Sequence, residues 1–196
     1  MLTNQQRDYF RKSSNKIPLI TLVGMMGAGK SKFGYTVAKI LNFNFYDSDN
    51  LIEKNFNTSI KELFESHGET YFRKIEKEKI KTIINNAIES GEEAIFSLGG
   101  GAFDNQHTRD LLLKTTRVIW LNVPIETLIK RVGEGTKRPM ITGNVEKSIS
   151  EILNKRVKYY SLSHHNLNTY NLSQELITKK IIEIIASKNS KVYKWK

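Results

Sequence analysis

Short apolar runs alternate with longer amphipathic segments along the chain, a pattern typical of a parallel β-sheet with helices packed against it. Five apolar runs predict strands, at residues 19–23, 43–46, 94–98, 118–123 and 166–170. Seven segments with helical periodicity predict helices, at residues 30–41, 60–66, 69–90, 106–114, 125–131, 145–160 and 174–187. Right-handed crossovers bring the loops after parallel strands to one edge of the sheet, where ligands of α/β proteins bind. We therefore expect the functional residues at that edge.

Local signals define the ends of two predicted helices and leave one long loop. Ser59, followed three residues later by Glu62, forms a capping-box pattern, and Gly91 is a suitable stop for the next helix. Residues 132–145 contain three glycines, a proline and two cations with little periodicity. A loop of this length in a small domain is commonly either disordered or a lid over a functional site.

The positive charge of the chain is concentrated at its two ends. The 196 residues carry a net charge of +11, which raises the question of nucleic-acid binding. Residues 1–16 contribute about +3 and residues 188–196 about +4. We interpret both tails as solvated basic extensions around a single domain at residues 17–187, and we expect no nucleic-acid partner.

The composition gives no sign of secretion or membrane insertion. The chain has no cysteine, and its first residues have no apolar core like that of a secretory signal. No apolar run approaches the roughly 20 residues of a membrane span. These observations predict a cytoplasmic protein without disulfides, thiolate nucleophiles or a membrane partner.

The segment GMMGAGKS has the spacing of a phosphate-binding P-loop, with four residues between the first glycine and GKS. It follows an apolar run and opens a predicted helix, so its backbone N–H groups and the positive helix end would face the same phosphates. Lys30 should reach the β- and γ-phosphates, and the Ser31 hydroxyl should bind Mg²⁺. We expect nucleotide contacts at Gly27, Ala28, Gly29, Lys30, Ser31 and Lys32.

Two carboxylates follow the second predicted strand, in the sequence DSDN. Asp47 and Asp49 are two residues apart, so in an extended chain both side chains point the same way. Beside a nucleotide and Mg²⁺, they would be able to order metal-bound water and accept a proton from an attacking hydroxyl. An Asp-rich turn that caps the next helix is the alternative, and the sequence leaves the two open.

Three arginines are candidates for binding anions. Arg73 lies within a helical turn of Glu69 and Glu76, which fits either a surface ion-pair ladder or an arginine directed at a substrate carboxylate. Arg138 precedes a proline in the long loop, where a closing lid would exclude water and neutralise a moving phosphate. Arg156 precedes two tyrosines, for which a solvated arginine beside core aromatics is the alternative.

A run of three glycines, Gly99, Gly100 and Gly101, follows the third predicted strand. Successive glycines cost backbone entropy, so they suggest that a ligand or another chain segment approaches the main chain closely. A structural turn is the alternative. Ser97 lies just before the run, where its hydroxyl would be able to reach water bound to Mg²⁺.

Taken in order, these motifs resemble those of the shikimate kinase family: GMMGAGKS, DSD, FRKIE, LGGGA, an RP pair in the long loop, and an arginine shortly before a tyrosine. The resemblance covers residues 20 to about 187. It implies a three-layer α/β fold of the nucleoside monophosphate kinase type, with five parallel strands ordered 2-3-1-4-5 and helices on both faces. It also implies transfer of the γ-phosphate of ATP to the 3-hydroxyl of shikimate, a step of chorismate and aromatic amino-acid biosynthesis.

The resemblance further implies roles for individual residues. Asp49 would hold ring hydroxyls of shikimate and activate the attacking one, whereas Asp47 would lie near the water around Mg²⁺. Arg138 would close over ATP and act in catalysis together with Lys30 and Asp49. Shikimate would contact the remaining positions, which are Arg73, Gly99, Gly100, Gly101 and Arg156. The expected partners of the protein, a monomer, are ATP or ADP, shikimate and Mg²⁺.

Three features depart from the family pattern. Lys158 stands where the family often has proline, and His164 stands where a small residue is usual. Both positions bear on the placement of the helix that carries Arg156. The lid sequence KRPMI also differs from the commoner form with leucines after the proline.

Two other classes of function are compatible with the motifs. One is a different small-molecule P-loop kinase, acting on gluconate or a nucleotide, and the other is a catalytically inactive module that keeps the fold. Paired arginines and closely packed glycines suit a compact carboxylate better than a nucleotide acceptor. The inactive module is disfavoured because the chain retains all the expected polar groups, namely Lys30, Ser31, Asp49, Arg73 and Arg138.

Overall fold

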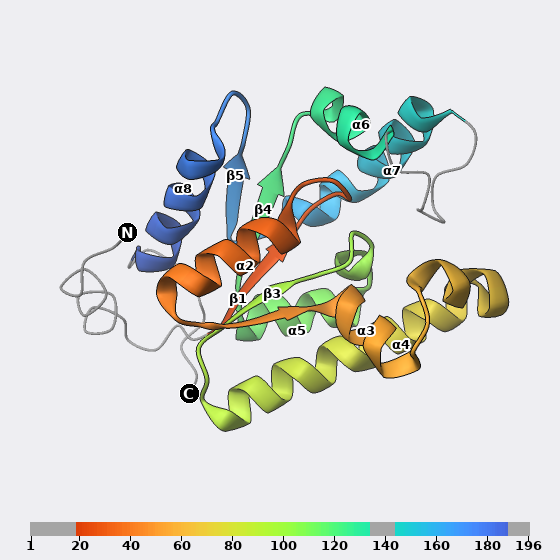
Figure 1. Cartoon of the computed structure of the whole chain (residues 1–196), viewed down its shortest axis with the longest axis horizontal. Coiled ribbons are helices and arrows are strands. Elements are labelled where there is room, and N and C mark those ends of the chain that lie inside the picture. Colours follow the sequence, from red (N-terminus) through yellow and green to blue (C-terminus); the bar gives the residue numbers. More distant parts are fainter. Residues whose placement is uncertain (1–18, 134–143, 188–196) are drawn as a thin grey trace.

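A five-stranded parallel sheet forms the centre of the computed structural model, which describes residues 19–133 and 144–187 (Figure 1). The strands are β1 (Leu19–Val23), β2 (Asn44–Asp47), β3 (Ala94–Ser97), β4 (Arg117–Asn122) and β5 (His165–Asn168). They lie in the order β2-β3-β1-β4-β5, and every neighbouring pair is parallel. This order confirms the fold class that the family resemblance implied.

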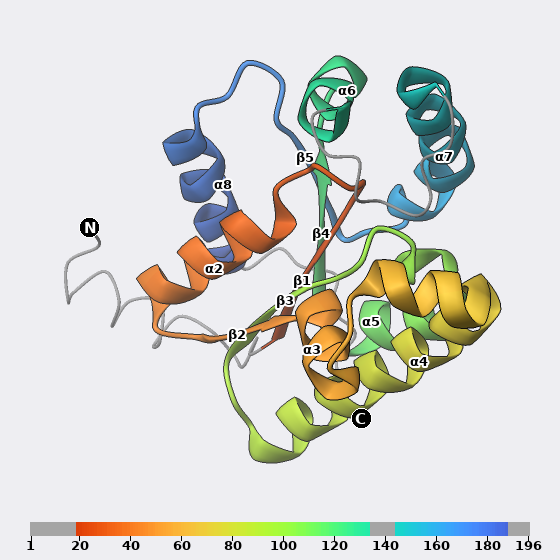
Figure 2. The ribbon, with the colours of Figure 1, turned by 45° about the vertical axis from the view of Figure 1, so that its right-hand side comes forward.

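Helices cover both faces of the sheet, as a parallel sheet requires. They are α2 (Lys30–Leu41), α3 (Ser48–Phe56), α4 (Ile60–Ser90), α5 (Gln106–Thr115), α6 (Ile125–Gly133), α7 (Val145–Tyr160) and α8 (Gln174–Ala186), with a short 3-10 turn, η1 (Ala102–Asp104). Helices α2 and α8 lie on one face, and α4 and α5 lie on the other (Figures 1 and 2). Within the described part of the chain, no helix is long and apolar enough to cross a membrane.

The central strands are the most deeply buried elements, in agreement with their continuous apolar sequence. All five residues of β1 are buried, and so are five of the six residues of β4. Edge strands β2 and β5 are only partly buried and carry polar residues. The bounds predicted from sequence match those of β1 and lie within one or two residues of the observed bounds of the other four strands.

The hydrophobic pattern did not predict helix α3, nor the short 3-10 turn η1. Only Ser48 and Ile52 of the nine residues of α3 are buried, so its amphipathic signal is weak. Ile52 packs with Leu63 and Phe72 of α4 in a small cluster apart from the main core. The helix is therefore held mainly by contacts with α4, which the sequence pattern alone does not reveal.

Helix α4 contains the break that the sequence predicted. Gly68 has φ 78° and ψ 171°, which is not helical, so the segment consists of two helical pieces that meet at this residue. Ser59 and Glu62 form the predicted capping box, and Gly91 ends the helix in the left-handed conformation. The separate predictions for residues 60–66 and 69–90 are therefore confirmed.

Candidate active site

The P-loop joins β1 to α2, with the geometry that its sequence predicts. Gly27 (φ 78°) and Gly29 (φ 87°) adopt positive φ values that L-residues rarely take, and α2 begins at Lys30. The Lys30 side chain is only 8% exposed, and its Nζ donates to the carbonyl oxygens of Gly24 (2.9 Å) and Met25 (3.0 Å). The residues expected to contact the nucleotide, 27–32, thus lie in this loop and in the first turn of the helix.

Side-chain oxygen atoms lie close together where the first turn of α2 meets the carboxyl ends of β2 and β3. The Ser31 and Ser97 hydroxyl oxygens lie 3.3 Å apart, and Asp47 is the register partner of Ser97 in the neighbouring strand. One Asp47 carboxylate oxygen accepts hydrogen bonds from the backbone N–H groups of Asp49 and Asn50, so this residue caps α3. The capping interpretation of Asp47 is therefore confirmed, and its second oxygen is not used by the cap.

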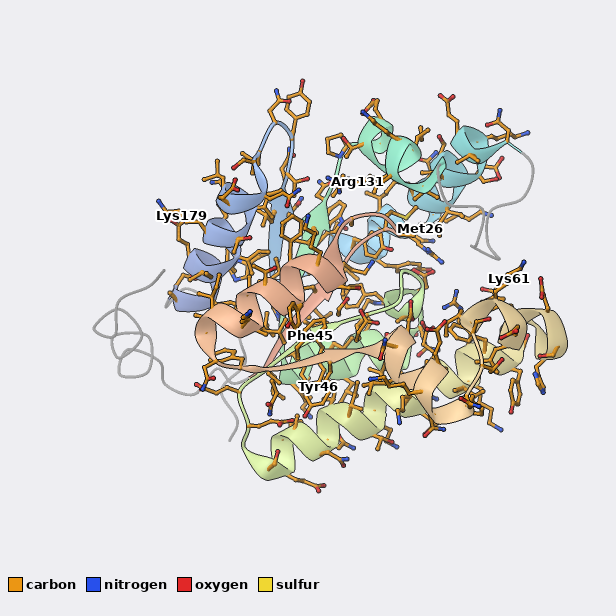
Figure 3. All side chains as sticks on the ribbon, in the orientation of Figure 1. Met26, Phe45, Tyr46, Lys61, Arg131 and Lys179 are labelled. Carbon is orange, nitrogen blue, oxygen red and sulfur yellow. The ribbon has the colours of Figure 1, made fainter. Side chains whose placement is uncertain are left out.

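A single pocket brings together all six residues expected to contact the acceptor. It is lined by Met26, Asp49, Ile60, Phe64, Phe72, Arg73, Glu76, Gly99, Gly100, Gly101 and Arg156. These residues come from the P-loop, α3, α4, the loop after β3, and α7. Gly100 lies directly against the P-loop, because a Cβ atom built on it would be 3.3 Å from the Met26 backbone nitrogen. Met26 is labelled in Figure 3. The pocket therefore adjoins the nucleotide loop.

Two guanidinium groups converge over Gly101. A Cβ atom at this position would lie 2.7 Å from Arg156 Nη2 and would overlap the guanidinium of Arg73, so a larger residue would have to displace both guanidinium groups. The Arg73 Nε donates to Glu69 (3.2 Å) and its Nη1 donates to Glu76 (2.6 Å). The ion-pair ladder predicted for Arg73 is therefore present, and the same side chain also lines the pocket.

A pair of carboxyl groups faces the neighbouring glycine, Gly99. A Cβ atom there would be 2.6 Å from both Asp49 Oδ1 and Glu76 Oε1. The pKa of Glu76 is raised to about 7, chiefly by burial and to a smaller extent by the nearby Asp49, while Arg73 and Arg156 act in the opposite direction. The sequence identified Glu76 only as an ion-pair partner, because its burial against α3 and the glycine loop depends on tertiary packing.

The helix that carries Arg156 is fixed to the glycine loop at two points. The Tyr160 hydroxyl donates to the Gly100 carbonyl oxygen (2.6 Å), and Arg156 Nε donates to Asp104 Oδ2 (2.8 Å). The departures at Lys158 and His164 do not move Arg156 out of the pocket. The Lys158 ammonium lies over the Tyr159 ring at 4.9 Å, and His164 Nδ1 accepts from the Val118 backbone N–H.

Two expected features fall outside the described residues. Arg138 and most of the predicted lid belong to residues 134–143, and the basic tails belong to residues 1–18 and 188–196. Elsewhere, in the ranges that the structure describes, no group of three or more His, Asp or Glu side chains is placed to hold a metal ion directly.

The P-loop, the strand order and an adjoining pocket lined by two arginines define a phosphotransferase fold of the nucleoside monophosphate kinase type. The sequence model of the shikimate kinase family matches residues 26–186. The chain belongs to the shikimate kinase family.

Individual relatives agree with this assignment. A shikimate kinase from Zymomonas mobilis is 38% identical over 164 residues, which cover 83% of this chain and 90% of the relative. A shikimate kinase from Brucella canis is 31% identical over 191 residues, which cover 94% of this chain and 93% of the relative. The structure of a shikimate kinase from Acinetobacter baumannii in complex with shikimate superposes with a TM-score of 0.80 and 29% identity, covering 91% of this chain and 98% of that one.

Proposed function

We infer that the protein is a shikimate kinase, which transfers the γ-phosphate of ATP to the 3-hydroxyl of shikimate and yields shikimate 3-phosphate and ADP. Membership of the family supports this activity and its place in chorismate and aromatic amino-acid biosynthesis. The observation that carries the inference is the pocket beside the P-loop, which unites Asp49, Arg73 and Arg156 with the glycine loop. One end of this pocket suits a carboxylate, and the other suits a hydroxyl near a phosphate.

On this proposal, the two arginines bind the carboxylate of the acceptor. Arg73 uses Nε and Nη1 for Glu69 and Glu76, so its Nη2 is directed over Gly101 toward the Nη2 of Arg156. Guanidinium groups bind carboxylates through short, charge-assisted hydrogen bonds, and two of them together orient a small acceptor. Binding in a defined orientation is a large part of what phosphoryl transfer requires.

Asp49 would then act on the attacking hydroxyl. It lies in the first turn of α3 and lines the pocket together with the glycine loop. A carboxylate in hydrogen-bond reach of the acceptor hydroxyl orients it and accepts its proton as the bond to phosphorus forms. The Arg73 and Arg156 pair holds the opposite end of the acceptor, which keeps the hydroxyl directed toward the P-loop.

The donor side is formed by the P-loop and α2. Lys30 would contact the β- and γ-phosphates, with backbone N–H groups from residues 27–32 around them. Mg²⁺ would bind the Ser31 hydroxyl, with Asp47 and Ser97 contacting its water; hydroxyl and carboxylate oxygens suit this hard cation. When bound, Mg²⁺ would neutralise charge on the phosphates. Arg138 would add a further positive charge from the lid.

A coupled assay of ADP release tests the proposed function against its alternatives. The full chain with ATP and Mg²⁺ is expected to turn over shikimate, and to release no ADP above background with gluconate or nucleoside monophosphates. Turnover of one of those acceptors without turnover of shikimate would assign a different small-molecule kinase. Binding of ATP without turnover of any acceptor would indicate an inactive module. A monomer in the cytoplasm, without nucleic-acid binding, stays a prediction.

The buried Glu76 gives a second prediction, on stability. Its pKa of about 7 lies above the ordinary value of 4.5, so its contribution to stability is complete below pH 4.5 and is lost as the pH rises through 7. Glu76→Gln mimics the protonated form and removes this loss. The free energy of unfolding of Glu76→Gln relative to the parent is therefore expected to rise between pH 4.5 and 8, by at most about 3 kcal/mol.

Chemical denaturation across this pH range measures the difference. Glu89→Gln is the matched control, because Glu89 is an exposed residue of the same helix. Its unfolding free energy should follow that of the parent at every pH. Curves for Glu76→Gln that also run parallel to the parent would show that folding does not raise the pKa of Glu76.

A further inference from the structure

Asp104 contacts the substrate arginine Arg156 although it does not line the acceptor pocket. Its Oδ2 accepts a 2.8 Å hydrogen bond from Arg156 Nε, across 52 residues of sequence. The Arg156 side chain is 5% exposed, whereas the Asp104 side chain is 34% exposed. Asp104 is therefore the more exposed partner of this ion pair.

This contact decides which edge of the guanidinium faces the acceptor. Arginine has five N–H donors fixed in one plane, so occupying Nε restricts the direction of the others. Nη2 would be 2.7 Å from a Cβ on Gly101, and Nη1 would be 3.4 Å from one on Gly100. Among the residues that the structure describes, Nη1 is buried and has no hydrogen-bond partner. Nη1 thus remains for a ligand.

The carboxylate of Asp104 is itself held by a rigid backbone. It ends η1, directly after the glycine loop, and its backbone N–H donates to the Gly101 carbonyl oxygen (3.1 Å). Arg109 Nη1 donates to the carbonyl oxygens of Phe103 and Asp104, both at 3.0 Å. The same short segment therefore supplies the glycine under the guanidinium and the carboxylate beside it.

We propose that Asp104 is a positioning residue for the acceptor, which holds Arg156 with its terminal nitrogens directed into the pocket. This role rests on the proposed function. A second effect opposes it, since the negative charge of Asp104 also repels an acidic acceptor. Positioning outweighs this repulsion because the carboxylate hydrogen-bonds Nε and not a terminal nitrogen, and because Arg73 adds a second positive charge beside Gly101.

Steady-state kinetics of Asp104→Ala and Asp104→Asn test the proposal. Asparagine keeps an oxygen that accepts the Nε hydrogen bond, whereas alanine removes it. Asp104→Ala is expected to raise the shikimate KM about tenfold, equivalent to about 1.4 kcal/mol, with kcat and the ATP KM within about twofold of the parent. Asp104→Asn is expected to remain within about threefold of the parent KM.

The control and the contrary outcomes separate this proposal from the proposed function. Asp110→Ala, an exposed aspartate of α5, should leave all constants unchanged. An unchanged or lower shikimate KM in Asp104→Ala would overturn the positioning role, as would a parallel loss of ATP affinity or the absence of rescue by asparagine. A parent protein that does not phosphorylate shikimate at all would overturn the proposed function instead.

Discussion

Replacing Lys30 with methionine is expected to lower kcat about a thousandfold, which is the largest effect predicted for a single substitution in this protein. The Lys30 ammonium is nearly buried at the mouth of the P-loop, where it donates to the Gly24 and Met25 carbonyl oxygens. In the proposed reaction, it exchanges these carbonyls for phosphate oxygens whose negative charge grows during transfer. Methionine keeps the length and packing of the side chain but supplies no charge.

The measurement is steady-state ADP release at saturating ATP and shikimate. Lys39→Met is the matched control, because Lys39 is an exposed lysine on the same helix, and it should retain the parent rate. A Lys30→Met enzyme within tenfold of the parent kcat would contradict the placement of the γ-phosphate at this loop. Circular dichroism of both variants shows whether the fold is intact.

Replacing Gly101 with alanine is expected to raise the shikimate KM at least about a hundredfold while leaving the ATP KM almost unchanged. The backbone at Gly101 has φ −98° and ψ −6°, which alanine adopts without strain, so the effect is steric. The new methyl group would occupy the space where the Arg73 and Arg156 guanidinium groups converge. Each charge-assisted hydrogen bond is worth about 1.5–3 kcal/mol, so displacing both arginines accounts for a change of this size.

The same geometry predicts that Gly101→Ala folds. The atoms displaced are the ends of two flexible side chains, so the cost falls on the binding site and not on the core. Gly133→Ala is the matched control, since a methyl group there meets no described residue within 4 Å. Calorimetric titration with shikimate measures the affinity directly. An unchanged affinity in Gly101→Ala would show that the acceptor carboxylate binds elsewhere.

The predictions that succeeded from sequence are those that depend on neighbouring residues. The capping box of Ser59 and Glu62 and the stop at Gly91 involve atoms within one turn of the chain. The P-loop is similar, because its conformation depends on glycines within eight residues and on the helix that follows. Such features can be predicted from sequence because the residues that form them are close together along the chain.

The predictions that were incomplete depend on packing between distant segments. Helix α3 was missed because Ile52 is buried only by its contact with α4. Arg73 looked like a surface residue or a substrate ligand, and the structure makes it both an ion-pair partner and part of the pocket. The contact of Asp104 with Arg156 spans two segments that have no sequence pattern in common.

The sequence by itself therefore predicted the P-loop as the nucleotide site and, through the family resemblance, the residues that are candidates for binding the acceptor. Only the tertiary structure showed that these residues line one pocket. They come from α3, α4, the loop after β3 and α7, which meet at one edge of the parallel sheet (Figures 1 and 2). The same packing buries Glu76 and raises its pKa. Burial, charge proximity and the direction of a guanidinium depend on three-dimensional neighbours, so a linear pattern does not contain them.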